Sequence, residues 1–524
     1  MIIKNVITVF ILAVFSFSFL SVKSIAIFQQ CSYRIKEFLP VLVKKKSGEI
    51  WRLLTYSLVF CFFVSILPFN LSCGKKVFSY AYFVCFVIGS GAYYLTDAII
   101  KRPRFTCRCV RVFVVSCLLY GLFSVVILKL FYGVSIYSVS ALISFMPILI
   151  PLFICISKVL NLPYDKTRYE ISKSICKRSL SKNKSLIKIG ITGSFAKTSV
   201  KNYLEKMLST KYRVLSTPKS YNTPLGICKA IKGKIDGADV FIAEMGARYK
   251  GDIKELCKMV APSVGVITGI AEQHTSTLGN VENVKRAKNQ LIEALPVGGF
   301  GVFSMQTLYS KQMYEGAKVE KYAVGGDSDC FVFYKNFKQL SSGISFEIVV
   351  GQKTYSVFAP LVGEQNAINI CLAVAVSLKL GVELNKILAV IPTLEAVEHR
   401  AKLINSVTGI TVIDDGYNAN LEGVKLTSQA VDAFSGFKIA VASGIVEVGK
   451  RTPEINCEVG AILANHFDLV IAVGVNACHI KSGASLQNCE VICVKRTEDA
   501  KKIIKERAKS GDVVVFFNDL PDRY

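Results

Sequence analysis

A lysine and a hydroxyl side chain follow a short apolar run near the middle of the 524-residue chain. The run covers residues 186–192, and its length and bounding glycine are typical of a buried parallel strand. The loop that follows consists of Gly193, Ser194, Phe195, Ala196, Lys197 and Thr198. A lysine can reach nucleotide phosphates and a threonine hydroxyl can bind Mg²⁺. The loop therefore predicts a nucleotide triphosphate site.

The residues after this loop predict a helix that begins at the site. Apolar side chains recur at helical spacing, at Val200, Tyr203, Leu204, Met207 and Leu208. A helix N-terminus offers unpaired N–H groups and a partial positive charge to phosphate. The full G-x-x-x-x-G-K-[ST] pattern is incomplete, because Ile191 and Ala196 occupy its two glycine positions. An ordinary strand-to-helix turn with a coincidental Lys-Thr pair stays open as the alternative.

Two further polar side chains follow predicted strands. Residues 239–243 lead into Glu244, and residues 264–268 lead into a loop that holds His274. Ligands bind at the carboxyl ends of parallel strands, so both side chains are expected beside Thr198. A hydroxyl, a carboxylate and an imidazole suit Mg²⁺ next to a triphosphate. The alternatives are an acid near a helix start for Glu244 and a surface loop position for His274.

The elements around these residues predict an α/β fold, because strand-like and helix-like runs alternate after residue 186. Residues 322–360 instead predict a β-meander, and residues 361–380 predict a helix. Residues 397–524 predict a second, smaller Rossmann-like domain. Its strands are expected near residues 410–414, 438–442, 469–473, 490–494 and 512–517.

The first part of the chain is strongly apolar and accounts for much of the 52% hydrophobic content. Five apolar runs are each about as long as the roughly 17 to 25 residues that cross a bilayer as a helix. They cover residues 5–22, 53–70, 77–95, 112–131 and 135–157. We predict five transmembrane helices. The alternative for the first run is a signal peptide, although Ser21-Val22 runs into Lys23 without a small-residue cleavage site.

Basic residues predict the orientation of these helices. Twelve Lys and Arg residues lie in the segments between the first and second runs and between the third and fourth, against four on the other side. The N-terminus is therefore expected outside, and everything after residue 158 in the cytoplasm. Sixteen basic residues precede residue 158, so much of the net charge of +26 reflects topology rather than nucleic-acid binding. The basic tract 158–188 could hold anionic lipid headgroups or be a solvated linker.

Seven segments in the cytoplasmic part resemble, in order, the motifs of the Mur ligase family, ATP-dependent amide ligases of cell-wall precursor synthesis. Within the family the resemblance is closest to the D-alanyl-D-alanine-adding MurF ligases, and it covers residues 186–524. The segments are ITGSFAKTS (191–199), YNTPLG (221–226), AEMGARYKGDI (243–253), ITGIAEQHTSTLGNVENVKRAKNQL (267–291), GEQNAINICLA (363–373), His399-Arg400 and IDDGYNAN (413–420).

The resemblance implies a role for each matching residue. It implies that Gly193 to Thr198 hold ATP phosphates and that Glu244 binds Mg²⁺. It also implies that His274 is a ligand of a second Mg²⁺ and that Lys288 is carbamylated and binds this second ion. Lys197, Lys288 and His274 would be catalytic. The resemblance further implies nucleotide-binding roles for Asn366 near adenine, Arg400 near the phosphates and Asp415.

Four departures from the family pattern qualify this expectation. Ala196 replaces a glycine, and an alanine fits there if its φ stays negative. Gln365 stands where the family usually has histidine, and the C-terminal end GDVVVFFNDLPDRY lacks a K-G-S-R-like element. The domain that binds the UDP end of the substrate is missing, and the five apolar runs occupy its place.

The domains expected are 1–157 (transmembrane), 158–185 (basic linker), 186–396 (central, ATP-binding) and 397–524 (C-terminal).

The sequence thus predicts an ADP-forming peptide ligase, anchored in the cytoplasmic membrane, that uses ATP and Mg²⁺. Its substrates would be a peptidoglycan precursor, which could be lipid-linked, and an amino acid or dipeptide amine; no nucleic acid partner is expected. One alternative is a membrane-attached ligase of another polymer, such as poly-γ-glutamate. Another is a non-catalytic nucleotide-binding scaffold for wall synthesis. A transporter is disfavoured because the apolar runs hold hardly any ionisable residues.

Overall fold

The chain divides into two compact units, residues 1–168 and residues 169–522, in a computed structural model. The residues that the structure describes are 2–31, 33–43, 49–70, 103–131, 145–271, 275–405, 408–416, 421–446, 448, 451–485 and 489–517. Each unit is treated by itself below.

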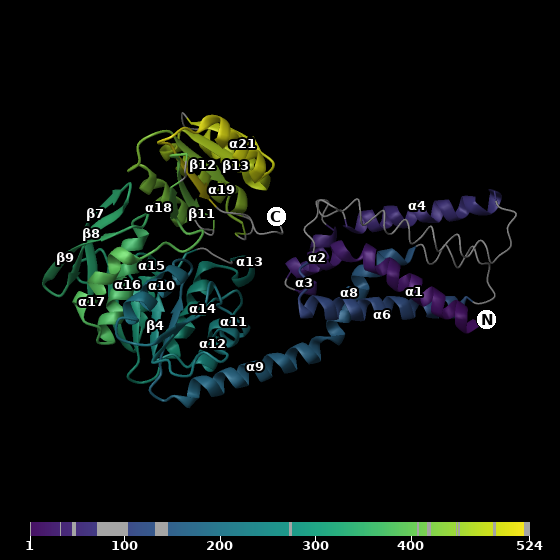
Figure 1. Cartoon of the computed structure of the whole chain (residues 1–524), viewed down its shortest axis with the longest axis horizontal. Helices are drawn as coiled ribbons and strands as arrows, with labels where there is room; N and C mark the ends of the chain where they lie inside the picture. Colours follow the sequence, from purple (N-terminus) through teal and green to yellow (C-terminus); the bar gives the residue numbers. More distant parts are fainter. Residues whose placement is uncertain are drawn as a thin grey trace. The chain divides into compact units, whose positions relative to one another are not determined.

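The first unit is helical throughout its described part (Figure 1). Large apolar side chains such as Phe17, Phe28, Phe38 and Tyr120 form its buried core. Its helices are α1 (Ile2–Leu20), α2 (Val22–Gln30), α3 (Ile35–Val43), α4 (Glu49–Asn70), α6 (Cys107–Leu130), η1 (Met146–Leu149), α8 (Ile150–Leu160) and the start of α9 (Leu162–Lys182).

Among the described residues, one helix is by itself long and apolar enough to cross a membrane, at Cys107–Ile127 in α6. Two bent helix pairs raise this number to three if each pair forms a single span. The predicted run 77–95 and the first part of the run 135–157 lie outside the described residues. Five spans therefore stay a prediction. The segment expected as a basic linker is largely helical, because α9 covers residues 162–182.

The second unit begins with a nine-stranded sheet in the order β2-β3-β1-β4-β5-β6-β7-β8-β9. Neighbours from β2 to β7 pair in parallel, whereas β7, β8 and β9 pair antiparallel. The β-meander predicted over residues 322–360 is therefore confirmed only for β7, β8 and β9, because β6 pairs in parallel with β5. The strands are β1 (Ile187–Thr192), β2 (Val214–Ser216), β3 (Val240–Glu244), β4 (Val264–Ile267), β5 (Phe300–Ser304), β6 (Glu320–Gly325), β7 (Val332–Leu340), β8 (Gly343–Val350) and β9 (Lys353–Ala359).

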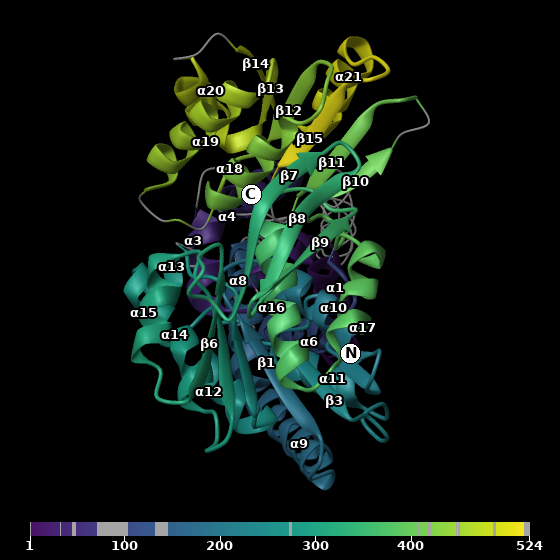
Figure 2. The same ribbon diagram turned by 90° about the vertical axis from the view of Figure 1, so that its left-hand side faces the viewer.

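Helices cover both faces of the parallel part of this sheet, because its strands alternate apolar side chains between the two faces. Ile189 and Ile191 of β1 share one core with α10 (Lys197–Leu208), α16 (Gln365–Lys379) and α17 (Leu384–Val390) (Figure 2). Phe241 and Ala243 of β3 share the opposite core with the remaining helices. These are α11 (Pro224–Ile231), α12 (Asp252–Val260), α13 (Thr275–Leu278), α14 (Val281–Glu293), α15 (Leu308–Gly316) and part of α9. The helix predicted over residues 361–380 begins later, at Gln365.

A second, six-stranded sheet follows in the order β10-β11-β15-β12-β13-β14. It is parallel except for β10, an antiparallel edge strand that the sequence analysis did not predict. The five strands expected from the sequence are all present. The strands are β10 (Lys402–Asn405), β11 (Thr411–Asp415), β12 (Lys438–Ala442), β13 (Leu469–Val473), β14 (Glu490–Val494) and β15 (Val513–Phe517), and the helices are α18 (Leu421–Val431), α19 (Thr452–His466), α20 (Ala477–Ala484) and α21 (Thr497–Arg507).

Candidate active site

The loop between β1 and α10 has the strand–loop–helix layout that its sequence predicts. Gly193 has to be a glycine, because an added Cβ would lie 2.0 Å from the Thr268 hydroxyl oxygen. The condition under which an alanine fits at position 196 is not met: the φ of Ala196 is +61°, in the left-handed region that disfavours side chains with a Cβ. Ala196 thus adopts a backbone conformation that favours glycine, at a cost in strain.

Glu244, the last residue of β3, lies beside the start of α10. The Thr198 hydroxyl donates to Glu244 Oε2 at 2.9 Å, and Asn222 Nδ2 lies 3.3 Å from Glu244 Oε1. The Lys201 amine lies 3.6 Å from Glu244 Oε2, and both side chains are only 1% exposed. Parallel pairing of Ile191 with Glu244 explains why the two strand ends meet here.

Two lysines meet on the other side of the loop. Lys197 and Lys288, from α10 and α14, each donate to the backbone oxygen of Gly193 at 2.8 Å. Burial lowers the pKa of Lys288 well below its usual range, and the nearby Lys197 lowers it further. Burial also lowers the pKa of Lys197 to about 8, although Glu244 acts in the opposite direction.

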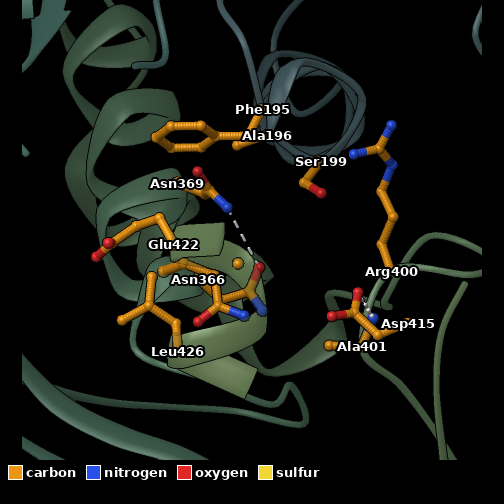
Figure 3. Close-up of a pocket in the computed structure, with 12 residues that line it drawn as sticks. Phe195, Ala196, Ser199, Asn366, Asn369, Arg400, Ala401, Asp415, Glu422 and Leu426 are labelled. Carbon is orange, nitrogen blue, oxygen red and sulfur yellow. Dashed lines mark hydrogen bonds between the residues drawn. The ribbon is translucent and has the colours of Figure 1, made fainter. Parts of the chain in front are cut away.

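A pocket lies next to this loop, between α10, α16 and the start of the second sheet. Figure 3 shows Phe195, Asn369 and Glu422 on one side of the pocket and Arg400 and Asp415 on the other. The residues that line it are Phe195, Ala196, Ser199, Gln365, Asn366, Asn369, Arg400, Ala401, Asp415, Glu422, Gly423 and Leu426.

Asn366 is held in place at the base of this pocket. Its Oδ1 accepts a hydrogen bond from the Tyr203 hydroxyl at 2.9 Å, and its Nδ2 donates to the Val362 oxygen at 2.8 Å. Asn369 Nδ2 lies 3.4 Å from the same Asn366 oxygen. The Oε1 atom of Gln365 is buried without a hydrogen-bond partner among the described residues. This wall of the pocket therefore presents amide groups, one of which has unused capacity.

Arg400 is presented by an unusual backbone segment. Both of its neighbours have positive φ, +62° at His399 and +48° at Ala401. Asp415 helps to fix this segment, since its Oδ1 accepts from the Ala401 N–H at 3.0 Å while its Oδ2 accepts from the Thr427 hydroxyl. The Arg400 Nε atom is buried and has no hydrogen-bond partner in the described part of the chain.

The structure thus brings together the predicted residues of the loop, Glu244, Lys288, Asn366, Arg400 and Asp415. His274 and residues 417–420 of the IDDGYNAN loop lie outside the described residues. Within the described ranges, no cluster of three or more His, Cys, Asp or Glu side chains could hold a metal ion. The metal-binding roles of Glu244 and His274 stay predictions.

Two family models match the second unit. Residues 191–377 match the Mur ligase middle domain, and residues 399–518 match the Mur ligase glutamate ligase domain. Together the two segments span more than half of the chain. This chain belongs to the Mur ligase family. Residues 1–190 lie outside both matches, so the family relationship rests on the second unit alone.

Curated Mur ligases support the same conclusion. The chain is 27% identical over 338 residues to the UDP-N-acetylmuramoyl-tripeptide–D-alanyl-D-alanine ligase of Bacillus subtilis, covering 63% of this chain and 72% of that protein. It is similar in fold to crystal structure I of MurF from Acinetobacter baumannii, with a TM-score of 0.62, 24% identity, and coverage of 67% and 77% of the two chains. MurF of Thermotoga maritima, solved in complex with ADP, gives a TM-score of 0.61 at 23% identity, with 67% and 80% covered.

The sequence analysis missed one charged residue of this Mur ligase site, Lys201, which lies beside Glu244. The Lys201 amine donates to the Thr217 oxygen at 2.6 Å and to the Lys219 oxygen, in addition to its contact with Glu244. A signal was available, because Lys201 follows Thr198 by three residues on a helix and so lies on the same face.

Proposed function

We propose that the chain is an ATP-dependent, ADP-forming peptide ligase that acts on a peptidoglycan precursor at the cytoplasmic face of the membrane. The curated relative from Bacillus subtilis bears the name of a ligase that joins D-alanyl-D-alanine to a UDP-N-acetylmuramoyl-tripeptide. The amine substrate proposed here is D-alanyl-D-alanine or a related amine.

The observation that carries this proposal is the charge of the site. The charge of Arg400 acts on Lys197 and Lys201, and that of Lys197 acts on Lys288. Two acids counteract these cations, since Glu244 acts on Lys197 and Lys201 and Glu205 acts on Lys201. The Arg400 Nε also lacks a partner among the described residues. Buried cations in excess require an anion, and a triphosphate beside a helix N-terminus supplies one.

The residues present fit a nucleotide. Lys197, Arg400 and the N–H groups at the start of α10 would hold the phosphates, and the amides of Asn366 and Asn369 would face the base. Phe195 and Leu426 line the same pocket and would contact the base through apolar surface. Because the left-handed Ala196 places a Cβ at the loop, phosphate would approach the backbone there less closely than at a glycine.

The chemistry proposed is transfer through an acyl phosphate. A substrate carboxylate oxygen attacks the γ-phosphorus of ATP, and the bond from that phosphorus to the bridging oxygen of ADP breaks. An amine then attacks the acyl carbon and loses a proton, inorganic phosphate leaves, and an amide remains. Lys197 and Arg400 would stabilise the negative charge of the transferring group, for which fixed cations in a buried site are effective.

The donor set around Glu244 also fits Mg²⁺. A carboxylate oxygen and a hydroxyl oxygen 2.9 Å apart are hard ligands of the kind that Mg²⁺ prefers. When bound, Mg²⁺ would neutralise phosphate charge. Thr198 and Glu244 would hold it, with the predicted ligand His274 and a carbamylated Lys288 for a second ion.

Membrane attachment is proposed from the first unit. Its described part contains one helix with the length and composition of a membrane span, or up to three. We propose a multi-pass anchor of five helices with the N-terminus outside, which would keep the ligase domains in the cytoplasm near a lipid-linked or membrane-proximal acceptor.

The test uses the full chain in nanodiscs with ATP, Mg²⁺, D-alanyl-D-alanine and either soluble or lipid-linked muramyl tripeptide. ADP release that requires both acceptor and amine is expected, and Lys197→Met should abolish it. Lys206→Met is the matched control, because Lys206 lies on the exposed face of the same helix. No ADP release with any acceptor and amine tried would contradict ligase activity.

Ala196 favours one alternative, a nucleotide-binding scaffold without turnover, because its left-handed backbone costs strain where catalysis needs close phosphate contact. Nucleotide binding without ADP release, together with normal growth of cells that carry Lys197→Ala, would support the scaffold. If ADP release instead required glutamate as the amine, the chain would be a ligase of another polymer such as poly-γ-glutamate.

A further inference from the structure

Three cations converge on one carboxylate in the first unit. Asp165 lies 2.7 Å from the Arg111 guanidinium, 2.9 Å from the Lys158 amine and 3.2 Å from the Arg108 guanidinium. Lys158 is 7% exposed, so its charge is largely removed from water. We call Arg108, Arg111, Lys158 and Asp165 the Asp165 cluster.

The charges of the Asp165 cluster do not balance. One carboxylate faces three cations, which leaves two positive charges in excess. The Nε atoms of Arg108 and Arg111 are both buried without a hydrogen-bond partner among the described residues. Asp97 lies outside the described residues, and one further carboxylate would still leave an excess of one positive charge in the cluster.

Aromatic rings face the two guanidinium groups without neutralising them. The Arg108 guanidinium lies 4.6 Å from the centre of the Tyr33 ring, and the Arg111 guanidinium lies 4.4 Å from that of Tyr164. Such contacts are attractive and hold the groups in place, but they add no negative charge. The cations are therefore fixed in position with hydrogen-bonding capacity left over.

The position of the cluster at a helix N-terminus also favours binding of an anion. Arg108 and Arg111 lie near the N-terminus of α6, where the helix dipole is positive, and the first turn of α6 contains no acidic residue. Cations are unfavourable at this end of a helix, and an anion there would be stabilised. Lys158 lies in the last turn of α8, so the cluster joins the ends of two apolar helices.

We propose that Arg108, Arg111 and Lys158 bind the phosphate of an anionic lipid headgroup. The proposal rests on the membrane attachment proposed above, which would place these helix ends at the cytoplasmic headgroup layer. Guanidinium groups pair with phosphate through two parallel hydrogen bonds, and the Arg108 and Arg111 side chains are 41% and 28% exposed, which leaves them accessible to a headgroup. A headgroup with a terminal phosphate, of charge about −1.5 to −2, matches the excess better than a phosphodiester.

The test measures lipid retained by the full chain. Nanodiscs would contain phosphatidylcholine mixed with either phosphatidic acid or phosphatidylglycerol, and lipid bound after detergent extraction would be counted by native mass spectrometry. Wild type should enrich phosphatidic acid most. Arg108→Gln, Arg111→Gln and Lys158→Gln should each lower this enrichment by about fivefold. Lys36→Gln is the control, because it removes an exposed cation from the same unit.

A purely structural role for the cluster predicts a different pattern. Asp165→Asn raises the excess charge, so a lipid site should retain more phosphatidic acid, whereas a purely structural cluster would lose thermal stability with no gain in lipid. Equal lipid retention by the Arg111→Gln and Lys36→Gln variants would overturn the proposal. If millimolar inorganic phosphate displaced the lipid, the site would bind free phosphate rather than a lipid headgroup, and the proposal would be wrong. ADP release, assayed on the same samples, reports the proposed ligase separately.

Discussion

Lys197 and Lys288 donate to one and the same acceptor, the backbone oxygen of Gly193, at 2.8 Å each. A carbonyl oxygen has two lone pairs and can serve both donors. Two ammonium groups this close repel each other, and burial disfavours both charges. The result is a pair of lysines whose protonated forms are destabilised until an anion binds.

The first prediction concerns the pH dependence of folding stability. The pKa of Lys197 is lowered to about 8 in the folded chain, against about 10.4 for an unperturbed lysine. Between these values the unfolded chain holds a proton that the folded chain has released, so the free energy of unfolding should rise with pH. Urea unfolding at pH 7.5 and pH 9.5 should show this rise, and Lys197→Met should reduce it. An identical rise in the variant would contradict the prediction.

The second prediction is that Ala196→Gly stabilises the chain. The left-handed conformation costs a residue with a Cβ about 1–2 kcal/mol, part of which glycine offsets through its larger entropy when unfolded. A net gain of about 0.5–1 kcal/mol in the free energy of unfolding is expected from denaturant titration. Nucleotide should also bind more tightly, because phosphate could approach the loop backbone.

Ala261→Gly is the matched control for Ala196→Gly. Ala261 has a φ of +50° and is the exposed residue that ends α12. It should give a similar gain in stability with no change in nucleotide affinity. Equal effects of the two variants on nucleotide affinity would show that the Ala196 side chain does not limit binding.

Much of the second unit follows from the alternation of apolar runs. The strands expected at residues 438–442, 469–473 and 490–494 have these bounds in the structure. The meeting of Thr198 with Glu244 was also predictable, because parallel strands place their carboxyl ends at one edge. These features depend on local sequence and on a general rule of topology.

Other features depend on tertiary contacts that no local pattern encodes. The positive φ of Ala196 could not be read from the sequence, because most alanines avoid that conformation. The edge strand β10, which pairs antiparallel with β11, has only four residues, too few for a clear alternation of apolar and polar side chains. The spacing from Thr198 places Lys201 on the helix face of the site, but its burial could not be predicted, because it is 1% exposed only where the loop after β2 covers it with carbonyl groups.

The third prediction is that Lys201→Met strongly destabilises the second unit. Lys201 and Glu244 are both 1% exposed, so removal of the cation leaves a buried carboxylate without its ionic partner. Breaking a buried pair in this way typically costs about 3–5 kcal/mol. Chemical denaturation measures the loss, and Lys201→Met combined with Glu244→Gln should recover much of it.

Lys206→Met provides the comparison on the same helix. Lys206 pairs with Glu395 at 3.4 Å, but their side chains are 41% and 85% exposed. Pairs in such solvent-exposed positions contribute about 0–1 kcal/mol, so this variant should unfold nearly like wild type. A loss for Lys201→Met no greater than that for Lys206→Met would mean that the buried pair does not matter for stability.

The fourth prediction is that Arg400→Gln weakens nucleotide binding while the nucleotide-free chain stays folded. The unpartnered Nε and its fixed neighbours His399 and Ala401 indicate a guanidinium held ready for an anion. A charge-assisted hydrogen bond is worth about 1.5–3 kcal/mol, so the dissociation constant for ATP should rise about 10- to 100-fold in calorimetric titrations. Because Arg400 lowers the pKa of Lys197, the variant should also raise that pKa. Lys425→Gln, at an exposed position of α18 near the pocket, should leave ATP affinity unchanged, and an equal loss in both variants would point to general charge rather than to Arg400.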